Sequence, residues 1–164
     1  MAITNYPSWE TELLETGLIV QNDDLSVAPE KAEQQFNRYV ALVDLVDGSE
    51  GQNAARALVK SLQSQNDYGA YQNTMNKLLF SFPPEQTAEA LVSELPRLIS
   101  HLPDWAGDLL SSLTQAQGVA TRLTFEFNLA LKSCGIEERN LISEFIHSQE
   151  GDGWLEHKRG ILGV

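Results

Sequence analysis

Cysteine, positive charge and long apolar segments are all scarce in this chain of 164 residues. The single cysteine, Cys134, has no partner within the chain, which excludes a disulfide scaffold and a cysteine-rich metal site and favours a reducing compartment. No apolar run approaches the roughly 20 residues of a membrane span, and the first residues lack the basic and apolar regions of a secretory signal. We therefore expect a cytoplasmic protein that is not inserted in a membrane.

Basic residues are outnumbered by acidic ones, 11 against 23, which gives a formal net charge of -12. The first thirty residues contain no Lys or Arg, but they hold six carboxylates: Glu10, Glu12, Glu15, Asp23, Asp24 and Glu30. A field of one sign selects partners of the opposite charge and speeds their capture from solution. Because DNA, RNA and anionic lipid would be repelled, the predicted partner is a cationic protein.

Sequence motifs that carry chemistry are also missing. The chain has no GxSxG or GxxxxGK[ST] motif and no GxGxxG after a strand, and its three histidines are too far apart to form an HExxH or His-x-His pair. Asp104 and Asp108 lie one helical turn apart, but in a chain this rich in acids such a pair more often caps a helix or faces solvent. We expect no enzyme activity, no cofactor and no metal site.

Length and apolar spacing predict one all-α domain over residues 1–164. Helices are expected to begin near Ser26, Ser49, Asp67, Pro83, Asp104 and Glu137. Residues 1–26 are expected to form an irregular or partly helical lead-in, and residues 151–164 a C-terminal tail. Short turns between consecutive helices predict stacked antiparallel hairpins, in either a short irregular α-solenoid or a compact helical bundle. The helices that begin near Ser26 and Ser49 are expected to form one such hairpin.

Two segments complicate this helical pattern. The alternating apolar residues of 119–133 would suit a strand, whereas Leu123, Phe127 and Leu131 fit one face of a helix, and the helical surroundings favour the helix. Pro96 lies inside the helix that follows Pro83. Its ring clashes with the carbonyl four residues back, so we expect a kink or a break there.

Tryptophan beside carboxylates is a second feature of binding surfaces. All three tryptophans have acidic neighbours in the sequence: Trp9, Trp105 and Trp154. An indole ring supplies contact area in an interface, and the acids pair with Lys or Arg of a partner. The predicted partner-binding set is Asp104, Trp105, Asp108, Asp23, Asp24, Glu10 and Trp9. The alternative is that each tryptophan anchors an irregular segment onto the body of the domain.

Most of the chain shows one pattern of acidic, amphipathic helices. The clearest examples are the segments PPEQTAEALVSELPRLISHLPDWAGDLLSSL (83–113) and LISEFIHSQEGDGWLEHKRGILGV (141–164). This succession of acidic amphipathic helix pairs resembles the helical, HEAT-like immunity proteins of bacterial polymorphic toxins, including those of contact-dependent inhibition. The resemblance implies an inhibitor that covers or distorts the active site of a cognate toxin. The implied toxin is basic, such as a nuclease with a cationic substrate groove. The alternative is a helical-repeat adaptor or secretion chaperone that holds another protein without inhibiting it.

Overall fold

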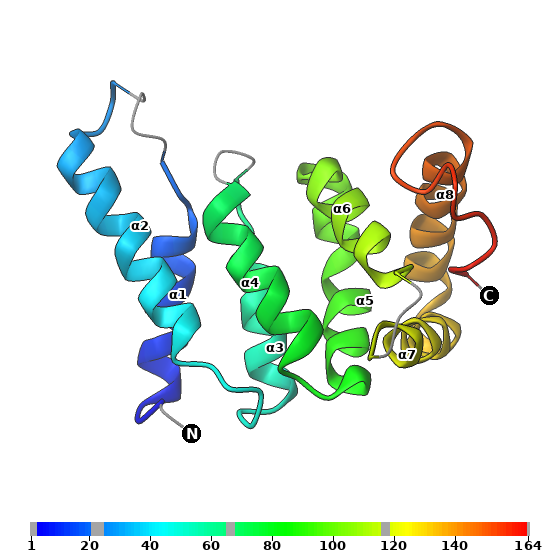
Figure 1. Ribbon diagram of the computed structural model, residues 1–164, viewed down its shortest axis with the longest axis horizontal. Helices are drawn as coiled ribbons and strands as arrows, with labels where there is room; N and C mark the ends of the chain where they lie inside the picture. The colour runs from blue at the N-terminus through cyan, green and yellow to red at the C-terminus, as the bar shows by residue number, and fades with distance from the viewer. Residues whose placement is uncertain (1–2, 21–24, 65–67, 116–118, 164) are drawn as a thin grey trace. The chain divides into compact units, whose positions relative to one another are not determined.

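The computed structural model describes residues 3–20, 25–64, 68–115 and 119–163. Regular structure in these ranges is entirely α-helical, which confirms the predicted fold class (Figure 1). The helices are α1 (Tyr6–Gly17), α2 (Pro29–Asp44), α3 (Gln52–Lys60), α4 (Tyr68–Phe80), α5 (Pro84–His101), α6 (Pro103–Leu113), α7 (Val119–Ser133) and α8 (Ile136–Asp152). None of the described helices is long and apolar enough to cross a membrane.

The chain divides into two compact units. The N-terminal unit, Met1–Phe82, contains α1 to α4, and the C-terminal unit, Pro83–Val164, contains α5 to α8. The single domain expected over residues 1–164 stays a prediction beside this division.

A full helix, α1, lies inside the expected lead-in. Asn5 caps it, because its side-chain oxygen accepts a hydrogen bond from the Ser8 amide at 3.2 Å, and a proline occupies the first turn. Trp9, Leu13 and Gly17 then follow at intervals of four residues and form the buried face of α1. The lead-in is thus helical over most of its first half.

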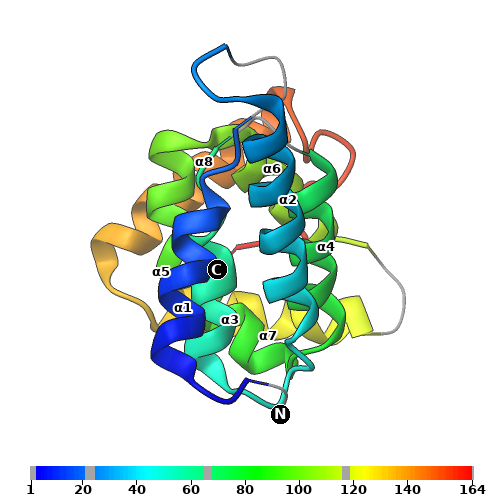
Figure 2. The same cartoon turned by 90° about the vertical axis from the view of Figure 1, so that its left-hand side faces the viewer.

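The helices of the N-terminal unit pair differently from the sequence expectation. Helix α1 packs against α2 and α3, and α4 packs against the same two helices. Figure 2 shows α1 and α2 side by side. The hairpins are therefore α1/α2 and α3/α4, whereas the sequence pattern paired the segments that begin near Ser26 and Ser49. Missing α1 as a complete helix shifted the predicted pairing by one element.

The C-terminal unit is built around α5, which packs against α6, α7 and α8. Leu91, Leu95 and Leu98 are buried along it. The helix continues through Pro96 from Pro84 to His101, so the expected break does not occur. Packing on three sides holds α5 helical where an isolated helix would be weakened by proline.

Helix α7 settles the ambiguity between helix and strand. Leu123, Phe127 and Leu131 are buried, while Phe125 and Leu129 are exposed. The spacing of the buried residues is that of a helix face, and α7 makes the most extensive helix contact of its unit with α5. The prediction of a helix over 119–133 is confirmed.

Candidate functional site

Two tryptophans of the predicted partner-binding set point into the protein. Trp9 is 3% exposed, and its Nε1 donates a hydrogen bond to the Leu42 carbonyl at 3.0 Å, which joins α1 to α2. Trp105 is 5% exposed and belongs to the buried face of α6. Each ring is buried within its own unit, so the expectation that these two rings supply contact area to a partner is corrected. Both tryptophans lie within helices, so the alternative that they anchor irregular segments does not describe them either.

The carboxylates of the set lie in several environments. Asp104 is exposed, Asp108 is half-buried and Glu10 is half-buried. Burial, together with the nearby charge of Glu10, raises the pKa of Tyr6 to about 12. Asp23 and Asp24 lie outside the described residues. Trp9 and Glu10 belong to the N-terminal unit, whereas Asp104, Trp105 and Asp108 belong to the C-terminal unit.

Trp154 is the tryptophan that the predicted set omitted, and it is the exposed one of the three. The side chain is 46% exposed and lies against Gly107 of α6, where a Cβ would overlap the indole Cδ1 and Nε1 atoms. Gly107 lies three residues after Asp104 and just before Asp108, so these positions share one face of α6. The structure therefore places the Trp154 indole against Gly107, on the turn of α6 that also carries Asp104 and Asp108.

The irregular segment after α8 is fixed to the unit on both sides of this indole. The Trp154 amide donates to Gln149 Oε1 at 3.2 Å, and Leu155 next to it is fully buried. Lys158 Nζ then donates to both the carbonyl and the hydroxyl oxygen of Ser111 on α6, each at 3.1 Å. Trp154 is consequently held in place without being covered.

Asp108 carries a carboxylate with one oxygen that no described residue satisfies. Its Oδ2 atom is buried and has no hydrogen-bond partner in the part of the chain that the structure describes. Burial raises the pKa of this carboxyl group above its ordinary value. Because this oxygen is buried, a donor outside the protein does not reach it directly, and the unsatisfied atom is a local cost to the fold.

Several cations of the protein are bound to backbone oxygen. Arg139 donates to the carbonyls of Leu131, Lys132 and Cys134. Lys77 donates to the Val46 carbonyl at 2.7 Å, and Arg159 donates to the Glu150 carbonyl at 2.7 Å. A cation bound to a carbonyl neutralises no carboxylate through that contact. These side chains therefore hold the fold together and leave acids elsewhere without a counter-ion.

The ion pairs that do form are few among the described residues. Arg38 of α2 donates through two nitrogens to the two oxygens of Glu12, at 2.5 and 2.6 Å, and these hydrogen bonds lower the pKa of Glu12. Two further pairs are present: Arg97 with Glu94 at 3.4 Å and Arg122 with Glu85 at 3.6 Å.

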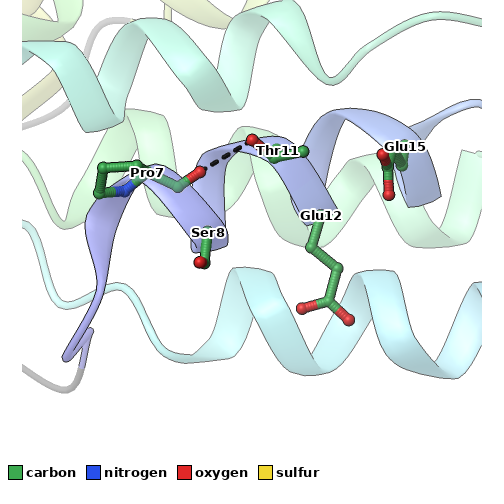
Figure 3. A pocket seen from close by; sticks show the side chains of 5 residues that line it. All are labelled: Pro7, Ser8, Thr11, Glu12 and Glu15. Carbon is green, nitrogen blue, oxygen red and sulfur yellow. Dashed lines mark hydrogen bonds between the residues drawn. The ribbon is translucent and has the colours of Figure 1, made fainter.

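A shallow hollow lies on α1 among the described residues (Figure 3). It is lined by Pro7, Ser8, Thr11, Glu12 and Glu15. Glu12 is already paired with Arg38, and the Thr11 hydroxyl donates to the Pro7 carbonyl at 2.9 Å. The hollow is open and its polar groups are partly used within the chain. The described residues also contain no group of three or more His, Cys, Asp or Glu side chains placed to hold a metal ion.

Fold and surface together define an all-helical protein with an acidic surface and a fixed, half-exposed tryptophan. No protein-family model, curated protein or solved structure matches the chain. The function of the protein is therefore inferred from its own sequence and structure.

Proposed function

We propose that this protein binds a basic protein through its acidic surface and inhibits it, as an immunity protein inhibits its cognate toxin. The observation that carries the proposal is that several of its cationic side chains bind backbone carbonyls. Lys77, Arg139 and Lys158 donate to backbone carbonyls instead of pairing with carboxylates. A formal net charge of -12 is thus expressed at the surface with little local neutralisation.

The exposed carboxylates supply the means of binding. Those without an ion pair in the described structure include Glu15, Glu89, Asp104, Glu137, Glu138, Glu144, Asp152 and Glu156. Such a surface attracts a protein with a cationic groove and accelerates encounter at low ionic strength. A nuclease groove that binds nucleic acid phosphates would accept the same charges, so the bound inhibitor would displace the substrate.

Capture followed by a protection assay tests the proposal. The tagged full chain is used to recover its partner from the cell of origin, and the activity of the purified partner is measured with increasing amounts of the chain. We expect a stoichiometric complex, complete inhibition, and an association rate that falls steeply between 50 and 500 mM salt, on the order of tenfold or more. A stable complex in which the partner keeps its activity would contradict inhibition and favour the adaptor or secretion chaperone.

A further inference from the structure

We propose that Trp154, with Asp104 and Asp108 of α6, forms a contact site for an arginine or lysine side chain of a basic protein. We call these three residues the Trp154 site. The inference rests on the proposed function and makes it specific, because it names one place on an acidic surface and the side chain that the place receives.

The first argument is preorganisation. Trp154 remains half-exposed even though residues on either side of it are fixed, by the buried Leu155 and by the bond from its own amide to Gln149. Gly107 lets the indole lie directly on the helix backbone. A ring held in this way loses little conformational entropy on binding, which is a property of residues that dominate protein interfaces.

The second argument is charge complementarity. An indole face attracts a cation that lies over it, and a carboxylate accepts hydrogen bonds from the same cation. Asp104 is exposed and Asp108 is half-buried, and the two lie within one helical turn of Gly107, against which Trp154 lies. A guanidinium group can stack on an aromatic ring and donate to carboxylates at its edge, so arginine fits the site best.

The third argument is that the nearest cations in the sequence bind other groups. Lys158 and Arg159 follow Trp154 closely, but their nitrogens donate to oxygen atoms of Ser111 and to the Glu150 carbonyl. Neither forms an ion pair with Asp104 or Asp108. The site thus lacks a cation from its own segment and is open to one from another protein.

A titration with an arginine peptide tests the site. The full chain, labelled with ¹⁵N, is titrated with an acetylated and amidated nona-arginine peptide at low salt while the three indole N–H signals are followed by NMR. We expect the Trp154 signal to shift, and the signals of the buried Trp9 and Trp105 to stay in place and report an intact fold. A Trp154 signal that does not move while the peptide binds would overturn the inference.

Matched variants separate the site from general attraction between opposite charges. Asp104→Asn with Asp108→Asn removes two carboxylates from the site, and Glu137→Gln with Glu138→Gln removes two exposed carboxylates from the start of α8. We expect the first pair of substitutions to weaken peptide binding at least about fivefold more than the second pair. Trp154→Ala should weaken binding by a factor similar to that of the first pair. Equal losses in the two pairs would contradict the site.

The same variants distinguish this inference from the proposed function. If both double variants bind the peptide equally but the unaltered chain still inhibits its captured partner, the Trp154 site is wrong and the inhibitor stands. If the arginine peptide shifts Trp154 as expected but the captured partner keeps its activity, the site stands and inhibition is rejected.

Discussion

The two units carry the same formal charge but differ in how many of their cations donate to backbone carbonyls. Residues 1–82 hold 11 acidic and five basic residues, and residues 83–164 hold 12 and six. Each unit therefore has a net charge of -6. Composition alone would make them equivalent binding surfaces.

In the N-terminal unit, carbonyls near the end of α1 are bound by neutral side chains. Tyr71 donates to the Gly17 carbonyl at 2.7 Å, Gln35 to Leu18 at 2.6 Å and Gln63 to Leu14 at 2.6 Å. Arg38 of this unit is left to pair with a carboxylate, Glu12.

Charged side chains take this role more often in the C-terminal unit than in the N-terminal unit, where Lys77 donates to the Val46 carbonyl. Arg139 binds three carbonyls near the end of α7, and Lys158 and Arg159 bind carbonyls of α6 and α8. Half of the six cationic side chains of this unit thus donate to backbone carbonyls. Equal net charge therefore conceals a difference: the carboxylates of the C-terminal unit have fewer cations available to neutralise them, and the Trp154 site lies among them.

The largest expected effect is on the turn between α2 and α3. Gly48 has a φ of 93°, and a Cβ there would overlap the backbone of Ser81. Gly51 has a φ of 90°, but no atom lies within 4 Å of its Cβ position. We expect Gly48→Ala to lower the free energy of unfolding by about 2–5 kcal/mol and Gly51→Ala by about 1–2 kcal/mol, measured by urea denaturation.

Amide hydrogen exchange would locate the loss of stability in Gly48→Ala. Because Gly48 and Ser81 both belong to the N-terminal unit, Gly48→Ala should reduce amide protection in α3 and α4 more than in α5 and α7. Uniform loss of protection along the whole chain would show that the two units unfold as one.

The fold of most segments could be predicted from apolar spacing, because tertiary packing and local periodicity agree there. Helices begin within about three residues of the positions expected for α2 to α6 and α8. Helix α1 was underestimated although its signals, Asn5 and Pro7 before Trp9 and Leu13, are present. Leu14 and Leu18 add apolar residues off its buried face and blur the period.

Long-range contacts explain what the sequence could not show. Continuity of α5 through Pro96 depends on three neighbouring helices, and proline rules describe a helix without them. The contact of Trp154 with Gly107 joins residues that are distant in the chain. Trp105 of α6 was expected in a partner-binding set, but local sequence could not reveal that Trp105 is buried and that the exposed Trp154 lies against Gly107 of this helix.

Removing a neutral side chain that donates to a backbone carbonyl should give the second largest loss of stability. Tyr71→Phe leaves the Gly17 carbonyl without its bond and removes the oxygen that accepts from the Ser64 amide, so we expect a loss of about 1–3 kcal/mol in thermal or urea unfolding. The matched control is Tyr6→Phe, because the Tyr6 hydroxyl is buried without a partner in the described structure. That control should be neutral or stabilising, and equal losses would reject the role of the Tyr71 bond.

Removing a charged side chain that donates to a backbone carbonyl tests the contribution of such bonds in the C-terminal unit. Lys158→Met deletes two hydrogen bonds to Ser111 and should lower the free energy of unfolding by about 1 kcal/mol. Lys132→Met removes the same charge from an exposed side chain that makes no described contact, and it should change stability little. If the two variants lose equal stability, Lys158 acts only through net charge and the distinction between the units fails.

The smallest effects concern pH, and they have opposite signs in the two units. The Arg38 hydrogen bonds lower the pKa of Glu12, so this group stabilises the fold above its ordinary value of 4.5, and the contribution is lost as pH falls through the lowered folded pKa. Burial raises the pKa of Asp108, so ionisation there opposes folding at neutral pH, and the penalty fades as pH falls towards 3.8.

Single variants resolve the two contributions in urea unfolding at pH 7 and pH 3. Glu12→Gln should be slightly less stable than the unaltered chain at pH 7, and Asp108→Asn slightly more stable, with both differences shrinking at pH 3. Asp108→Asn should also bind the arginine peptide more weakly while being more stable. A carboxylate that lowers stability and raises affinity is one that serves binding at a cost to folding, whereas loss of both properties would make Asp108 an ordinary structural residue.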